Sequence, residues 1–272
     1  MPRQAHPSLR RKVILTASMV RTYKACPRLY ELEYIHQLKP VTPGEALTTG
    51  SQYHDYVAKI LSGEEYRLEG IAGTMAAAFD RFLPWREWGI KAVEQEFAVK
   101  ITPYFIIRGK IDAVCEDGCI VEHKTTRNTL DDMYLERLAL DDQVSIYLAA
   151  QTLLSDKLIN RVHYTAVQKP TIRQKQNETD SQFQERVRDW YDETRVKSFT
   201  VVRTFSQIEE TIAHLKELAK EIRRRKFWYR NPAHCMIVDC PYRSICLDCD
   251  PQTLTGFVKK ENNNEELSPC KF

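Results

Sequence analysis

The stretch GKIDAVCEDGCIVEHKT, residues 109–125, decides the fold. Two runs rich in Val and Ile flank the tripeptide Glu-Asp-Gly at 116–118, which is a turn signal between strands. The sequence therefore predicts a β-hairpin. Because side chains alternate along a strand, Glu122 and Lys124 point to the same face, and pairing across the tight turn brings Asp112 close to them.

Two carboxylates that converge on a sheet surface form a hard-oxygen site suited to Mg²⁺ or Mn²⁺. A lysine beside them can orient or deprotonate a water while the metal stabilises charge developing on a phosphate. The peptide oxygen of His123 offers a further ligand. An Asp and a Glu-x-Lys are also common on solvent-facing hairpins, so the motif gains its meaning only together with others.

Composition indicates an ordinary globular protein. Of the 272 residues, 43% are apolar and 28% are charged, and 40 Lys+Arg against 37 Asp+Glu give a net charge of +3. This charge is too small to indicate nucleic-acid binding by itself. The absence of any apolar stretch of about 18 residues excludes a conventional membrane helix. With no secretory signal recognisable, we expect a cytoplasmic protein that contacts no membrane.

Hydrophobic periodicity places helices on both sides of a strand-rich centre. The predicted helices are 18–36 (capped by Ser18 and broken near Pro27), 46–61, 74–88, 140–154, 180–194 and 207–226. The predicted strands are 94–102, 105–115, 119–125, 161–168 and 198–203. This order indicates an α/β core with helical flanks, in which 1–250 form a single domain and 251–272 a loose polar tail.

Two further motifs flank the hairpin. Gly50-Ser51-Gln52-Tyr53-His54 places a histidine on the helix before it, and Gln143 and Tyr147 stand four residues apart on the helix after it. Taken singly, His54 fits a structural or solvated histidine, and Tyr147 fits a core tyrosine with a polar neighbour.

The order of the four motifs is more specific than any one of them. Gly-x-x-x-His, Gly-x-x-Asp, Glu-x-Lys and Gln-x-x-x-Tyr together resemble the motif series of RecB-like nucleases in the PD-(D/E)XK superfamily, over about residues 18–246. Ile111 stands where the superfamily name has a proline. The resemblance implies a restriction-endonuclease-like core, with a central mixed sheet flanked by helices, a helical N-terminal part and a cysteine-rich C-terminal segment.

The resemblance also implies a role for each motif residue. The metal ligands would be Asp112, Glu122, His54 and the peptide oxygen of His123. The residues that position water, support the site or contact the DNA strand would be Lys124, Gln143 and Tyr147. The implied reaction is hydrolysis of a phosphodiester by a metal-activated water.

Eight cysteines are many for a cytoplasmic chain, and metal or cluster ligation accounts for them better than disulfides. Four of them resemble the iron–sulfur subset of RecB-like nucleases, found in AddB-type and CRISPR-associated exonucleases. The implied [4Fe–4S] ligands, which would staple the chain's two ends together, are Cys26, Cys235, Cys240 and Cys246. Four residues separate the first two late cysteines, where two are usual in that subset.

Two alternative roles for these cysteines stay open. Cys249 forms a C-x-x-C with Cys246, so a structural Zn²⁺ site built from the four late cysteines is the main alternative, and unligated thiols are another. Cys115 and Cys119, which flank the hairpin turn, fit packing better than ligation.

The resemblance favours an exonuclease that acts on single-stranded DNA or DNA ends. No G-x-x-x-x-G-K-[ST] motif occurs, so a helicase, or a recombination or CRISPR adaptation protein, would be a separate partner. The alternatives are a non-catalytic nucleic-acid-binding protein and a structural metal or cluster protein with a nuclease fold. The basic run 223–226 and the aromatic run 227–229 have the charge and the rings needed to bind single-stranded DNA. They fit slightly better as a basic helix end followed by aromatic side chains that pack into the core.

Overall fold

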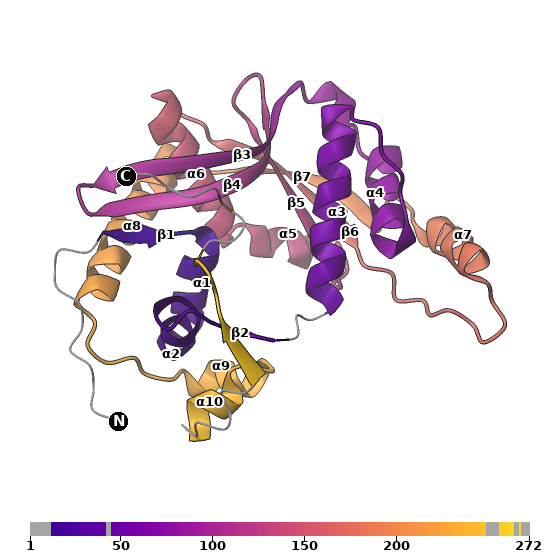
Figure 1. The fold of residues 1–272 in the computed structure, drawn as a ribbon. Helices are drawn as coiled ribbons and strands as arrows, with labels where there is room; N and C mark the ends of the chain where they lie inside the picture. Colours follow the sequence, from indigo (N-terminus) through magenta and orange to yellow (C-terminus); the bar gives the residue numbers. More distant parts are fainter. Residues whose placement is uncertain (1–11, 42–44, 249–255, 264–266, 268–272) are drawn as a thin grey trace. The chain divides into compact units, whose positions relative to one another are not determined.

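The computed structural model describes residues 12–41, 45–248, 256–263 and 267 (Figure 1). The chain forms two compact units. Unit 1 comprises Met1–Pro43, Ala98–Gly109 and Glu210–Phe272, and unit 2 comprises Gly44–Phe97 and Lys110–Glu209. Two long strands contribute to both units: β3 (Ile90–Thr102) and β4 (Phe105–Cys115).

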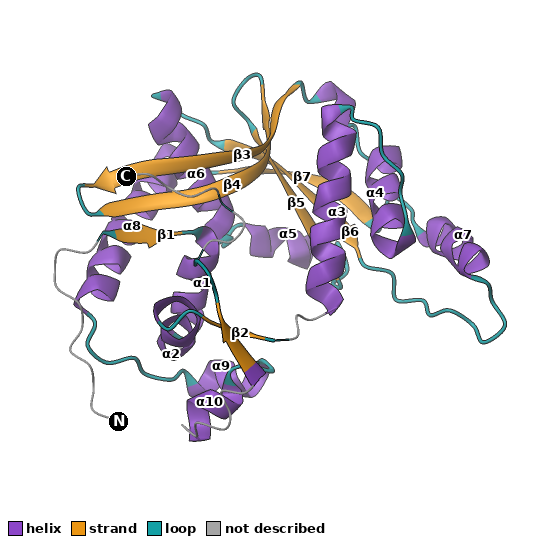
Figure 2. Cartoon of the chain, viewed as in Figure 1, coloured by secondary structure: helices purple, strands orange, loops and turns teal. Residues whose placement is uncertain are grey.

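The centre of the fold is a mixed β-sheet, as the sequence predicts (Figure 2). Its strand order is β1-β4-β5-β6-β7, and β3 also pairs with β4. The remaining strands are β1 (Val13–Leu15), β5 (Ile120–Thr126), β6 (Arg161–Gln168) and β7 (Val196–Val202). The β1–β4 and β5–β6 pairs are parallel, and the β4–β5 and β6–β7 pairs are antiparallel.

The hairpin between β4 and β5 has a short antiparallel register. Ala113 pairs with Val121 and Val114 with Ile120. One step further from the turn, the backbone N–H of His123 donates to the carboxylate of Asp112 at 2.7 Å. The Asp112 carboxylate thus accepts a backbone N–H that a strand carbonyl would otherwise accept. Both carboxylates lie where the backbone pairing of β4 with β5 ends.

Unit 2 packs helices against the sheet. These are α3 (Glu45–Ser62), α4 (Gly70–Phe82), the 3₁₀ turn η2 (Trp85–Glu87), α5 (Asp132–Leu138), α6 (Asp142–Ser155) and α7 (Asp180–Trp190). The α3 and α4 helices lie side by side (Figure 1). Tyr53, Met75, Phe79 and Val187 from these helices pack with Val121 of β5 in one buried cluster, which fixes the strand that carries Glu122.

Unit 1 contains the N-terminal helices and the cysteine-rich end. Its elements are α1 (Ala17–Ala25), α2 (Pro27–Tyr30), the π-helical turn η1 (Glu31–Ile35), β2 (Leu38–Pro40), α9 (Pro232–Ile237), α10 (Arg243–Asp248) and β8 (Phe257–Lys259). Helix α8 (Phe205–Arg224) begins in unit 2 and continues through unit 1. The β2 and β8 strands pair antiparallel.

The predicted break at Pro27 is confirmed, since α1 ends at Ala25 and the proline occupies the first turn of α2. The predicted cap is wrong by two residues. Thr16, not Ser18, caps α1, because its hydroxyl accepts the N–H of Met19 at 3.2 Å.

Four other helices differ from the sequence-based expectation. Helix α4 covers 70–82 rather than 74–88, because Pro84 follows its end and 85–87 form a separate turn. Helix α5 was not predicted, and α9 and α10 lie where irregular chain was expected.

Of the predicted loose tail, residues 256–263 include β8, while 251–255, 264–266 and 268–272 lie outside the described residues, and the prediction stands untested there. Within the described ranges, no helix is long and apolar enough to span a bilayer.

Candidate functional site

The predicted carboxylates meet in unit 2, one on each strand of the hairpin. Asp112 precedes the paired Ala113 on β4, and Glu122 follows the paired Val121 on β5. Both are buried, with exposed fractions of 9% and 2%. His54 reaches them from α3, and its Nδ1 lies 3.2 Å from Oδ1 of Asp112. The structure therefore brings the first three predicted motifs together.

The fourth motif joins the same group. Lys124 forms an ion pair with Oε1 of Glu122 and donates to Oε1 of Gln143 at 3.0 Å. The amide nitrogen of Gln143 in turn donates to Oε1 of Glu122 at 2.8 Å and to the Tyr147 hydroxyl at 3.1 Å. Asp141 caps α6 by accepting the N–H of Gln143 at 2.8 Å, which stabilises the first turn of the helix that carries Gln143.

Burial and mutual charge shift the titration of these groups. Burial, with the charge of Asp112, raises the pKa of Glu122 to about 7, although Lys124 opposes the shift. Burial also disfavours the charged form of Asp112, but the His54 hydrogen bond and charge outweigh it and hold the pKa of Asp112 well below its usual range. Burial lowers the pKa of Lys124, yet Glu122 and Asp112 raise it overall, so the ammonium persists at neutral pH.

The donor set fits a hard divalent cation. Among the described residues, Oε2 of Glu122 is buried without a hydrogen-bond partner, although a buried carboxylate oxygen ordinarily has one. A cation would satisfy this oxygen together with Asp112, and carboxylate oxygens are what Mg²⁺ and Mn²⁺ prefer.

His123 has its side chain on the opposite side of its strand. Its Nδ1 lies 2.7 Å from the hydroxyl of Thr165, and its ring meets Phe79 edge-on at 5.1 Å. Burial lowers the pKa of this imidazole to about 4, so the ring is neutral. His123 offers two groups that can bind a metal, the imidazole and the peptide oxygen. The sequence pattern assigns the peptide oxygen to the metal.

Two neighbours of the site were not predicted as site residues. Lys110 forms an ion pair with Glu94, whose backbone has a φ of 53°, a left-handed conformation that non-glycine residues seldom adopt. Lys110 lies two residues before Asp112 on the same strand. Because side chains alternate along a strand, the sequence already indicated that the two share a face. Phe97 packs edge-on against the ring of Tyr147, with ring centroids 5.5 Å apart. Only the tertiary structure reveals this contact.

The four predicted cluster cysteines meet in unit 1. Cys26 stands between α1 and α2, and Cys235, Cys240 and Cys246 come from the segment of α9 and α10. Together they line one cavity of about 90 Å³, whose other lining includes Leu29, Leu32 and Leu247. This space exceeds the need of a single water molecule. Burial raises the pKa of the Cys240 thiol, and the three neighbouring cysteines raise it further.

Polar contacts hold the walls of this cavity. Arg243 donates to the backbone oxygens of Cys235 at 3.0 Å and of Val238 at 3.1 Å, and Arg230 donates to that of Cys246. Asn231 donates to the backbone oxygen of Ala25 at 2.8 Å, beside Cys26. A protein contact therefore links the two sequence-distant cysteine segments. Cys249, the competing ligand, lies outside the described residues.

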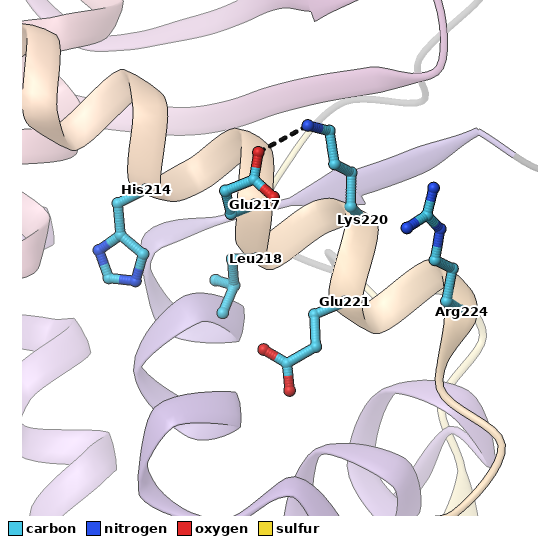
Figure 3. A pocket seen from close by; sticks show the side chains of 6 residues that line it. All are labelled: His214, Glu217, Leu218, Lys220, Glu221 and Arg224. Atoms are coloured by element: carbon cyan, nitrogen blue, oxygen red, sulfur yellow. Dashed lines mark hydrogen bonds and ion pairs between the residues drawn. The ribbon is translucent and has the colours of Figure 1, made fainter.

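A second hollow lies on α8 and offers no comparable donor set. Figure 3 shows its lining: His214, Glu217, Leu218, Lys220, Glu221 and Arg224. Glu217 and Lys220 form an ion pair with an N–O distance of 2.6 Å, and both side chains are exposed. Surface ion pairs one helical turn apart are ordinary, and we assign no role to this hollow.

The aromatic run near the end of α8 divides between surface and core. Trp228 is buried and stacks on Tyr30 with ring centroids 5.7 Å apart, as the inward-packing alternative predicts. Phe227 and Tyr229 are exposed.

A mixed sheet flanked by helices, with buried carboxylates and a lysine on adjacent strands, defines a nuclease-like α/β fold. The chain matches the PD-(D/E)XK nuclease superfamily over residues 14–84 and 64–247, and it belongs to that superfamily. Members of this superfamily use divalent metals such as Mg²⁺ or Mn²⁺. No curated protein matches the chain at a significant level.

One solved structure with a TM-score above 0.5 supports the fold. A protein from Eubacterium rectale, provisionally described as an exonuclease, is 10% identical, with coverage of 89% of this chain and 92% of that chain and a TM-score of 0.57. A phage-related exonuclease from Haemophilus somnus 129PT is 11% identical, with coverage of 78% and 94% and a TM-score of 0.40. At these identities the likeness concerns the fold alone.

Proposed function

We propose that the protein is a metal-dependent deoxyribonuclease and that Asp112, Glu122 and Lys124 form its centre. The observation that carries the proposal is the unpartnered, buried Oε2 of Glu122 beside Asp112, within a superfamily of nucleases. His54 and the peptide oxygen of His123 complete the proposed ligand set. A bound Mg²⁺ or Mn²⁺ supplies Lewis-acid stabilisation of charge on the phosphate.

The protein's own residues would prepare the attack on the phosphate. The Lys124 ammonium, held by Glu122 and Gln143, is placed to donate to the oxygen of an attacking water and to orient it. Gln143 fixes Glu122 and Lys124 at once, so it is a positioning residue. The Tyr147 hydroxyl, hydrogen-bonded to Gln143, is the group we assign to contact with the DNA strand.

The proposed substrate is single-stranded DNA or a DNA end, and the proposed mode of cleavage is exonucleolytic. The structural neighbour from Eubacterium rectale is provisionally described as an exonuclease, which supports this choice. A helicase, or a recombination or CRISPR adaptation protein, is the proposed partner class, because the chain contains no P-loop of its own.

We also propose that Cys26, Cys235, Cys240 and Cys246 bind a [4Fe–4S] cluster in unit 1. Four thiols around one cavity with aliphatic walls match the Cys₄ ligand set of such clusters. The role proposed for the cluster is structural, holding the two ends of the chain together. A structural zinc site built from the four late cysteines is the alternative, and the visible spectrum separates the two.

The deciding experiment compares two ion-paired lysines. Anaerobically purified wild-type protein, Lys124→Ala and Lys220→Ala are assayed on end-labelled linear and circular single-stranded DNA with Mg²⁺ or Mn²⁺. We expect loss of linear DNA alone, abolished by Lys124→Ala and retained in Lys220→Ala, whose lysine also pairs with a glutamate.

Cleavage of circular DNA would make the enzyme an endonuclease. If wild-type protein binds DNA but cleaves none with either metal, the protein is a non-catalytic binding module. Cleavage that survives in Lys124→Ala would show that the active centre lies elsewhere.

A further inference from the structure

The closed end of the β4–β5 hairpin carries a second group of metal-ligating side chains, within unit 2 and apart from the carboxylate site. Cys115 ends β4, Cys119 directly precedes β5, and His163 lies on β6. One ligand atom from each lies within 4.8 Å of the other two. We propose that these three residues bind a thiophilic divalent metal ion, Zn²⁺, at a site independent of the nuclease centre.

Strand register brings the three side chains together. The N–H of Cys115 donates to the backbone oxygen of Cys119 at 2.8 Å, so the two cysteines face each other across the hairpin. In the neighbouring parallel pair, Val121 lies beside His163. Because side chains alternate, Cys119 and Val121 share a face, and His163 joins them on it. Two strands, β4 and β6, and the residue directly before β5 thus each contribute one ligand.

The donor set suits zinc better than the hard cation of the carboxylate site. Zinc binds cysteine thiolates and histidine nitrogens with tetrahedral geometry. Both thiols are nearly inaccessible, with exposed fractions of 2% for Cys115 and 3% for Cys119, whereas His163 is partly exposed and opens a route from solvent. Three protein ligands leave the fourth position for a water.

The surroundings hold the imidazole and the turn in place. The Trp88 ring stacks on His163 with centroids 4.8 Å apart and planes at 4°, which restricts rotation of the imidazole. The turn is anchored where the N–H of Glu116 donates to the backbone oxygen of Gly89 at 2.8 Å. Asp117 accepts the N–H of Cys119 at 2.9 Å and pairs with Arg161. Ligands held this way lose little freedom on binding a metal.

The test is zinc binding by the full-length chain. Zinc and iron per chain are measured for wild-type protein, Cys119→Ser, His163→Gln and the control His214→Gln, which alters an exposed histidine on α8. We expect Cys119→Ser to lack one equivalent of zinc that wild type and His214→Gln retain, with iron unchanged. Zinc affinity in His163→Gln should fall by more than the roughly 10- to 100-fold that loss of an outer-shell partner costs.

X-ray absorption at the zinc edge should show sulfur and nitrogen ligands for this equivalent. Because His163 is partly exposed, His163→Gln tests the proposal even if Cys119→Ser fails to fold. Equal zinc content and affinity in wild type, His163→Gln and His214→Gln would overturn it. A Cys115–Cys119 disulfide in the anaerobically purified protein would overturn it as well.

Discussion

The carboxylate site of unit 2 and the cysteine cavity of unit 1 use opposite means to hold their ligands. In unit 2, Glu122 is already bound by Lys124 and Gln143, so a hydrogen-bonded network fixes the oxygen donors before any metal arrives. In unit 1, the thiols surround a cavity with aliphatic walls, and the polar contacts hold the backbone around them. The difference teaches that loss of a ligand should affect chemistry in unit 2 and folding in unit 1.

The largest effect should come from removing one charge at the carboxylate site. Glu122→Gln keeps the shape of the side chain and an acceptor for Lys124 but weakens metal binding. We expect nuclease activity to fall by at least about 10³-fold, since metal stabilisation of phosphate charge contributes several kcal/mol. Single-turnover cleavage measures this, with Glu217→Gln as the control. Equal loss of nuclease activity in both variants, or loss of iron from Glu122→Gln, would contradict the expectation that ligand loss in unit 2 affects chemistry and leaves unit 1 intact.

The complementary change is Cys240→Ser in the cavity of unit 1. We expect loss of the visible absorption of the cluster and a fall in unfolding free energy of more than about 2 kcal/mol, because ligand loss removes metal-linked folding energy. The thermal midpoint should drop by roughly 4–8 °C, measured by calorimetry. Affinity of the carboxylate site for Mn²⁺ should stay within a few-fold. An unchanged midpoint and spectrum would show that no structural cluster forms there.

The pH response should distinguish the centres next. Burial raises the pKa of Glu122 to about 7, and a metal needs the ionised carboxylate, so Mn²⁺ affinity should fall by up to about tenfold per unit as pH drops below 7. In metal-free protein, the stability of the fold changes with pH in the opposite direction. The raised pKa stabilises the fold below the unfolded value, and this contribution is lost as pH rises through about 7. Calorimetric Mn²⁺ titrations across this range measure the effect, and a pH-independent affinity would contradict it.

The smallest effect should separate stability from positioning within unit 2. Asp141 caps α6, which carries Gln143 and Tyr147, whereas Thr179 caps α7 in a capping box. Asp141→Ala and Thr179→Ala should each cost about 1 kcal/mol of unfolding free energy. Only Asp141→Ala should also reduce kcat, because it loosens the helix that holds Gln143. Equal kcat values in the two variants would show that the cap has no influence on the site.

Local patterns were sufficient for the strands β3 to β7 and for the grouping of the motif residues, whereas β1, β2 and β8 were not predicted. Alternation and the Glu-Asp-Gly turn predicted β4 at its observed bounds, and the side chains of Asp112, Glu122 and Lys124 meet as expected. Their roles remain predictions.

Features that depend on tertiary context were not predictable. The helical cap falls on Thr16 rather than Ser18 because cap choice depends on where the preceding strand ends. The short helices α9 and α10 lack a periodic stripe long enough to detect. The proximity of His163 to Cys115 and Cys119 depends on β5–β6 pairing across about forty residues, which no local motif encodes.

The pairing of β2 with β8 has a consequence for biosynthesis. β2 ends at residue 40 and β8 at residue 259, so β2 can pair with β8 only after more than 200 further residues have been translated. Unit 2 has all of its residues by 209. On the ribosome, the half with the carboxylates can therefore be complete while the half with the cysteine cavity still lacks a strand. A chain truncated after residue 209 would then retain every residue of the carboxylate site and lose the β2–β8 pair.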